Sequence, residues 1–112
     1  MARRSPSIIR YLLMYGLWTT FTTQAGQRDH VIALLLEAAA SLETHPSCLH
    51  YIISSSDEPD VLYVREIWTD AAAHLASLEL PVTRRLITQA RPLLERVERV
   101  LEDHPLGGKG LM

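Results

Sequence analysis

The chain has 112 residues, of which 47% are hydrophobic and 21% are charged, with a formal net charge of −2. This composition is typical of a single globular domain and excludes a largely disordered chain. The slight negative charge and the single cysteine, Cys48, argue against a dedicated nucleic-acid binder, a disulfide framework and a zinc site built from several thiolates.

The N-terminal region has the basic and apolar residues of a signal peptide without its organisation. Arg10 interrupts the apolar stretch, and no small-residue cleavage site follows it. The longest uncharged run, residues 11–27, is too short and too rich in threonine and glutamine to span a membrane. We therefore expect a cytoplasmic protein without membrane contact, in which residues 1–13 form a partly disordered extension and residues 14–112 form a single domain.

The first part of the domain is predicted to be a strand followed by a helix. Residues 15–23 are rich in threonine and aromatic residues and end at a turn around Gly26. Asp29 suits the positive end of a helix that begins there. Apolar residues follow at helical spacing, namely Val31, Leu34, Leu35, Ala38 and Leu42. Pro46 is expected to stop this helix.

The middle of the chain predicts two strands and two short helical segments. Residues 48–55 and 61–68 have strand composition, and the polar loop 54–60 joins them. Asp70 resembles the N-cap of a short helix that begins in a run of alanines, and Pro81 breaks this helix. A second short helical stripe follows, made by Val82, Leu86 and Ala90.

The last segment is ambiguous from periodicity alone. Leu93, Leu94, Val97, Val100 and Leu101 fit a helix, whereas Val97, Arg99 and Leu101 also alternate as in a strand. If the segment is a strand, the order is β-α-β-β-α-β. This is the ferredoxin-like arrangement of the α+β class, an antiparallel sheet with both helices on one face.

Both faces of the predicted sheet are apolar. In the third strand, Val61, Tyr63 and Ile67 alternate with Leu62, Val64 and Trp68. Two helices cover only one face of such a sheet, and an exposed antiparallel face normally alternates with polar residues. We therefore expect a homodimer through sheet faces. The alternative is a monomer in which the second face borders a ligand cavity.

Several short sequence motifs occur along the chain in an order and at a spacing that together are typical of one protein family. They include Ala25-Gly26-Gln27-Arg28-Asp29, His45-Pro46-Ser47-Cys48-Leu49-His50-Tyr51, Val64-Arg65-Glu66-Ile67-Trp68, Ala73-His74 before Ser77-Leu78, and Gly107-Gly108-Lys109-Gly110-Leu111. In order and spacing they resemble the antibiotic biosynthesis monooxygenase domain family, of the quinol monooxygenase type. Ser47 stands where the family usually has glycine. The resemblance covers about residues 14–111 and implies a final strand within residues 96–102.

The resemblance also implies an assembly and an activity. The family forms dimers of open sheets, a dimeric α/β barrel-like arrangement, with a small pocket between each sheet and its helices. Some members oxidise activated aromatic substrates with dioxygen and without metal, flavin or haem. We therefore expect a cofactor-independent monooxygenase that acts on a small aromatic or quinol substrate. The alternative is a non-catalytic or stress-linked dimeric domain that binds a small apolar ligand.

Three residues are the main candidates for chemistry. His74 is the candidate catalytic base, because an imidazole exchanges protons near neutral pH and a quinol anion gives electrons to oxygen more readily than the neutral quinol. Trp68 is expected to form an aromatic wall and to donate its N–H to a substrate oxygen. Glu66 lies on the same strand face as Trp68, so its carboxylate must be paired, either with a helix end or with His74. For each of the three, a packing role is the alternative.

Further substrate-binding candidates are Tyr51, Tyr63 and Trp18, through their hydroxyl groups and aromatic rings, although each also fits a place in the core. The five histidines are scattered and show no His-x-x-x-His spacing, and no glycine-rich loop opens a helix. We therefore expect neither a metal nor a bound cofactor.

Overall fold

The computed structural model describes residues 13–111, and the expected extension over residues 1–13 lies outside this range except for Leu13. The strands are β1 (Tyr15–Thr23), β2 (Cys48–Ser55), β3 (Val61–Trp68) and β4 (Leu94–Asp103). The helices are α2 (Arg28–Ser41), α3 (Ala71–Ser77) and α4 (Pro81–Ala90), and a 3-10 turn at Arg91–Leu93 leads into β4. Within the described residues, no helix has the length and apolar character needed to cross a membrane.

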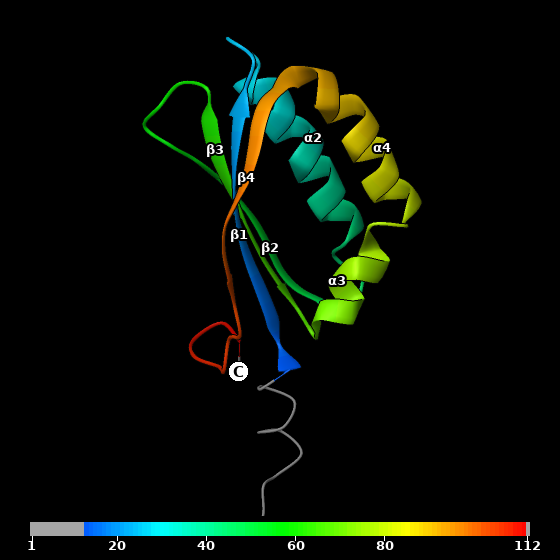
Figure 1. Cartoon of the computed structure of the whole chain (residues 1–112). Helices are drawn as coiled ribbons and strands as arrows, with labels where there is room; N and C mark the ends of the chain where they lie inside the picture. Colours follow the sequence, from blue (N-terminus) through cyan, green and yellow to red (C-terminus); the bar gives the residue numbers. More distant parts are fainter. Residues whose placement is uncertain (1–12, 112) are drawn as a thin grey trace, which may run out of the picture.

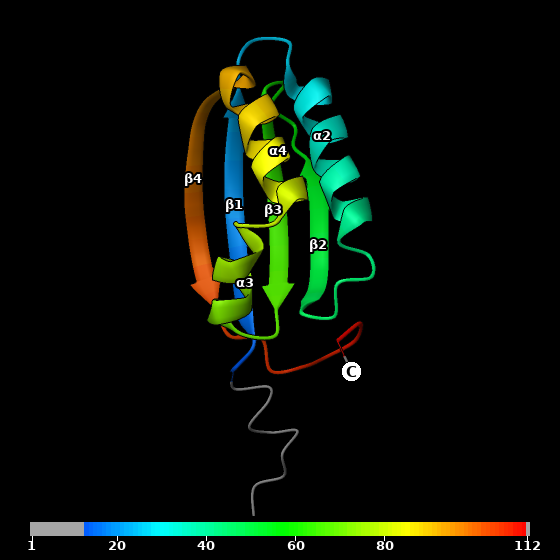
Figure 2. The same cartoon turned by 90° about the vertical axis from the view of Figure 1, so that its right-hand side faces the viewer.

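The four strands form one antiparallel sheet in the order β2-β3-β1-β4. All three helices lie on one face of this sheet, and the other face is uncovered (Figures 1 and 2). The ferredoxin-like α+β prediction is therefore confirmed, with the second helical region divided into α3 and α4. Pro81 explains the division, because it cannot continue α3 but serves as the first residue of α4.

The ambiguous last segment is a strand. β4 pairs with β1 from Thr23–Leu94 to Gly16–Asp103, with two shifts of register. Ten residues long, it extends beyond the expected residues 96–102 at both ends. Its pairing with the central strand β1 decides between two periodicities that the sequence leaves open.

Helix α2 packs its predicted stripe on the sheet. Val31, Leu35 and Ala38 are buried, and the first two join Leu62 and Val64 of β3 in the core. The helix ends at Ser41, which corrects the expected stop at Pro46. The reason is a tight turn before the proline, in which the N–H of Leu42 is shared between two carbonyl groups of the last helical turn.

The uncovered face of the sheet, here called the open face, carries large apolar side chains. Trp18, Ile52, Tyr63 and Leu101 are each between 40% and 48% exposed. Among them lies a polar contact, in which Arg65 is 4.4 Å from the centre of the Trp18 ring and 3.2 Å from an Asp103 carboxylate oxygen. Both faces of the sheet therefore carry large apolar side chains, as the sequence predicts, although the open face also carries charged residues.

Candidate active site

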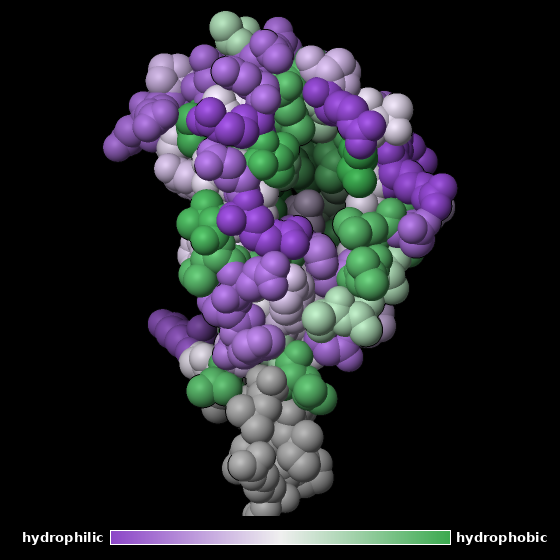
Figure 3. All heavy atoms as spheres, in the orientation of Figure 1, coloured by the Kyte–Doolittle hydropathy of each residue, from purple (hydrophilic) through white to green (hydrophobic). Residues whose placement is uncertain are grey.

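A cavity of about 470 Å³ lies between the covered face of the sheet and the three helices. Figure 3 shows the hollow between these two layers, with hydrophobic side chains on its walls. Its apolar lining comes from β1, α2 and α4, and includes Phe21, Val31, Leu35, Ala38, Leu86 and Ile87.

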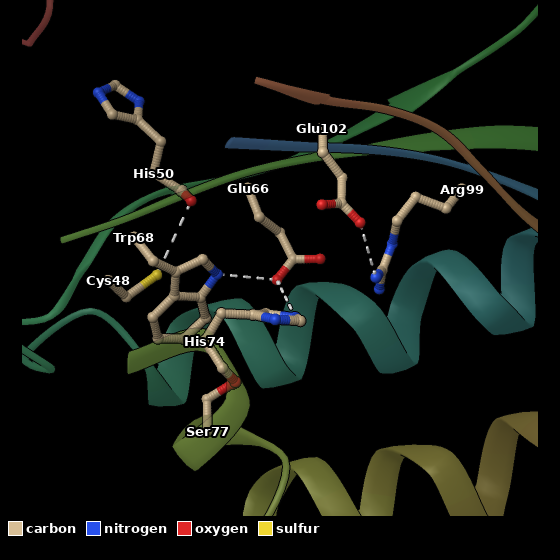
Figure 4. A network of polar contacts seen from close by, with 8 residues as sticks. All are labelled: Cys48, His50, Glu66, Trp68, His74, Ser77, Arg99 and Glu102. Carbon is tan, nitrogen blue, oxygen red and sulfur yellow. Dashed lines mark hydrogen bonds and ion pairs between the residues drawn. The ribbon is translucent and has the colours of Figure 1, made fainter. Parts of the chain in front are cut away.

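One part of the cavity is lined by a carboxylate, an indole and an imidazole (Figure 4). The Trp68 Nε1–H donates a hydrogen bond to Oε1 of Glu66 at 3.0 Å. The same oxygen lies 3.9 Å from Nε2 of His74. The rings of His74 and Trp68 have their centres 5.9 Å apart in an edge-on arrangement. Three side chains from β3 and α3 thus converge on one point.

Glu66 is a largely buried carboxyl group, with 14% of its side chain exposed. Burial raises its pKa, and the Trp68 N–H and Arg99 act in the opposite direction. Its Oε2 has no hydrogen-bond partner among the described residues, yet it is not sealed inside the protein. This oxygen therefore remains accessible to a molecule in the cavity.

His74 is placed by the short helix α3. Asp70 caps this helix by accepting the N–H of Ala73 at 2.7 Å, as predicted, and Ser77 donates its hydroxyl to the carbonyl of His74 at 2.6 Å. The imidazole also packs against Tyr15, with ring centres 5.5 Å apart. Burial, followed by the charge of Arg99, lowers its pKa. The ring is therefore neutral at pH 7 and able to accept a proton.

The expected role of the Trp68 N–H is corrected by this geometry. The N–H is directed at Glu66 and is not free to bind a substrate oxygen. A buried carboxylate is the stronger acceptor, because hydrogen bonds to charged groups exceed those to neutral ones. Trp68 keeps its position as an aromatic wall of the cavity.

The three aromatic candidates divide between the two faces of the sheet. Tyr51 lines the cavity, and burial raises its pKa, so its hydroxyl stays protonated. Tyr63 and Trp18 do not join it, because both belong to the open face. Successive side chains of a strand alternate, and Tyr63 is an odd number of residues from Trp68. The structure therefore does not bring Tyr63 and Trp18 together with Tyr51 in this cavity.

Sequence reasoning missed the contribution of the last strand. Arg91, Arg96 and Arg99 all line the cavity, together with Glu95. The signal was present in the alternation of Val97 and Arg99, but it has meaning only once the segment is known to be a strand. A register shift after Arg99 then moves Leu101 to the open face. Within residues 13–111, no group of three or more His, Cys, Asp or Glu side chains is placed to hold a metal ion.

Fold and cavity together define a small ferredoxin-like α+β domain with a largely apolar cavity between its sheet and helices, and comparisons with known proteins identify its family. The family model described as "antibiotic biosynthesis monooxygenase" matches residues 14–89. A crystal structure from Chloroflexus aurantiacus, assigned to the same class of enzyme, shares 36% sequence identity, with coverage of 88% of this chain and 99% of that chain and a TM-score of 0.75. The chain therefore belongs to the antibiotic biosynthesis monooxygenase family.

More distant structures support the fold alone. One from Bacteroides thetaiotaomicron shares 16% identity over 88% of this chain and 95% of that chain, with a TM-score of 0.77. Another, from Deinococcus radiodurans, shares 20% identity over 89% of this chain and 99% of that chain, with a TM-score of 0.72. Comparison with curated proteins gave no match.

Proposed function

We propose that this protein is a monooxygenase that oxidises a small aromatic or quinol substrate with dioxygen and needs no metal, flavin or haem. The observation that carries the proposal is a neutral imidazole beside a buried carboxyl group in an otherwise apolar cavity. An apolar cavity with a few converging polar groups is the usual form of a small-molecule site. A quinol supplies its own electrons, so the protein has to provide only binding, orientation and a proton acceptor.

In the proposed reaction, His74 accepts the proton of a substrate hydroxyl group. The positive charge that the ring gains lies 3.9 Å from Oε1 of Glu66, where an ionised carboxylate stabilises it. The quinol anion passes electrons to dioxygen. One oxygen atom then bonds to a ring carbon and the other leaves as water, so that hydroquinone and one O₂ give hydroxyquinone and one H₂O. Trp68 and Tyr51 border the space in which the aromatic ring lies.

We also propose that the protein is a homodimer through its sheet faces. The open face exposes four large apolar side chains, and a second copy of the same face would cover them. Light scattering should then give about twice the monomer mass of 12.6 kDa at micromolar concentration. A monomer under these conditions would contradict the assembly without affecting the cavity chemistry.

The test of the activity is oxygen consumption by metal-free and flavin-free protein with a panel of hydroquinones. His74→Ala should lower the turnover about 10²–10⁴-fold, the usual contribution of a positioned acid–base group. His30→Ala is the matched control, because His30 is an exposed residue of α2 that does not line the cavity. Circular dichroism and melting curves should be similar for the two variants.

The possible results separate the candidates. If His74→Ala keeps full activity, His74 is not the base. If its activity falls only in proportion to the folded fraction, His74 is a packing residue. If the wild-type protein consumes no oxygen above the spontaneous rate but binds quinones saturably, the alternative holds, namely a non-catalytic or stress-linked dimeric domain that binds a small apolar ligand.

A further inference from the structure

One wall of the cavity is unusually rich in arginine. The segment from the 3-10 turn into β4 contributes Arg91, Arg96 and Arg99 to the lining, and only one carboxylate, Glu95, lies beside them. The rest of the lining is apolar except for the Glu66–His74 region and a few hydroxyl groups. Arg96 is paired with Thr22, on the open-face register of β1, and its guanidinium group pairs there with Glu98. A small neutral quinol makes no use of the guanidinium groups of Arg91 and Arg99.

The ion pairs that two of these arginines form with nearby glutamates are weak. Arg96 lies 2.8 Å from Glu98, and Arg99 lies 3.4 Å from Glu102. The four side chains are between 49% and 61% exposed, and ion pairs at this exposure contribute little. Neither glutamate lines the cavity. Arg99 can therefore exchange its partner for an anionic group inside the cavity at small cost.

Arg99 lies within reach of the Glu66–His74 pair. On the covered face, Leu17 of β1 is paired on one side with Glu66 and on the other with Glu102, while Arg99 is paired with Thr19, the next residue on the same face. Two residues along a strand correspond to about 7 Å, and the two strand spacings between β3 and β4 add roughly 10 Å across β1. The long side chain of Arg99 extends over part of this distance, since it lines the cavity and its charge acts to lower the pKa of both Glu66 and His74. Figure 4 shows Arg99 and Glu102 directed to the same side of the sheet as Glu66 and His74.

We propose that the cavity selects a quinol that carries a carboxylate on its ring, with the hydroxyl group at Glu66 and His74 and the carboxylate at Arg99. The planar guanidinium binds a carboxylate through two parallel hydrogen bonds, which suits it to this role better than a lysine. Arg91 has no carboxylate within ion-pair distance among residues 13–111, and it adds positive charge to the same wall. The placement of a reacting quinol hydroxyl group at Glu66 and His74 rests on the proposed oxygenase activity. The binding of a carboxylate at Arg99 does not depend on that activity.

Two probes of nearly equal shape test the proposal, namely gentisate (2,5-dihydroxybenzoate) and its methyl ester. Both are hydroquinones, and only gentisate carries a negative charge. Binding is measured without oxygen by quenching of tryptophan fluorescence, and turnover is measured by oxygen uptake. Gentisate should bind about tenfold more tightly than the ester, the effect expected of a charge-assisted hydrogen bond. The preference should decrease with added salt.

Variants identify the residue responsible. Arg99→Gln should reduce the ratio of acid to ester affinity to about one, and Arg99→Lys should give an intermediate ratio because it keeps the charge and loses the second hydrogen bond. Arg85→Gln is the matched control, since Arg85 is an exposed arginine of α4 that does not line this cavity. It should keep the full preference for the acid.

The outcomes distinguish this proposal from the proposed activity. If acid and ester bind and react equally, the carboxylate proposal is overturned and the oxygenase activity stands. If gentisate is preferred in an Arg99-dependent way but no oxygen is consumed, the carboxylate site stands and the oxygenase activity falls. If Arg91→Gln abolishes the preference and Arg99→Gln does not, the assignment to Arg99 is wrong.

Discussion

Replacement of Trp68 by phenylalanine isolates the hydrogen bond that holds Glu66. Trp68 is only 1% exposed, and its N–H lies 3.0 Å from Glu66 Oε1. Loss of a hydrogen bond to an ionised carboxylate costs about 1.5–3 kcal/mol of unfolding free energy. The smaller ring also leaves roughly 40 Å³ unfilled, which costs about 1 kcal/mol. At pH 8 the variant should therefore be less stable than the wild type by about 3 kcal/mol.

The loss of unfolding free energy caused by Trp68→Phe should be larger at high pH than at low pH. The folded protein raises the pKa of Glu66, so this group contributes stability below its unfolded pKa and loses it as the pH rises through its folded pKa. Trp68→Phe removes an N–H that lowers the pKa of Glu66, so the loss of stability with rising pH becomes larger. At pH 4 the carboxyl is protonated, the lost bond is a neutral one worth about 1 kcal/mol, and the total cost falls to about 2 kcal/mol.

The assay is urea denaturation at the two pH values, with Trp18→Phe as the matched control. Trp18 is 40% exposed on the open face, and its recorded polar contact is the Arg65 guanidinium over its ring. Trp18→Phe should cost about 1 kcal/mol or less at both pH values. An equal cost of Trp68→Phe at pH 4 and pH 8 would refute the assignment of a charged hydrogen bond, as would the same pH dependence in the control.

Three further predictions concern other parts of the fold. Gly16→Ala should lower the unfolding free energy by only about 0.5–1 kcal/mol, because the new Cβ displaces the movable ends of Asp103 and Arg65 and disturbs their partly exposed ion pair, and a loss of several kcal/mol would contradict the freedom of these two side chains to move. Asp70→Ala should cost about 1 kcal/mol through loss of the α3 N-cap, whereas Asp70→Asn should retain most of the stability in the same melting experiment. Burial and the charge of Glu66 raise the pKa of the Cys48 thiol to about 11. Its reaction with iodoacetamide at pH 8 should therefore be at least about tenfold slower than in the urea-unfolded chain, and equal rates would contradict the buried environment.

The sequence by itself determined the order of the elements and part of the site. The helical stripe of α2 is visible in the sequence because helices and strands have different hydrophobic periods. Glu66 and Trp68 share a face because they are two residues apart in a strand. The same alternation separates Tyr63 from Trp68, and its consistent use would have removed Tyr63 from the list of pocket residues. The sequence motifs that resemble the antibiotic biosynthesis monooxygenase family then indicated a strand in the last segment, where hydrophobic periodicity fitted both a helix and a strand.

Only the tertiary structure decided which of these residues meet. His74 approaches Glu66 because α3 folds back over the sheet, and the Trp68 N–H is used inside the protein because the adjacent carboxylate needs a donor once it is buried. Arg99 reaches the cavity through the pairing of β4 with β1, a contact between segments about 80 residues apart. Local periodicity specifies the face of an element on which a side chain lies. The partners of that face depend on strand order, register and helix packing, which are properties of the folded chain as a whole.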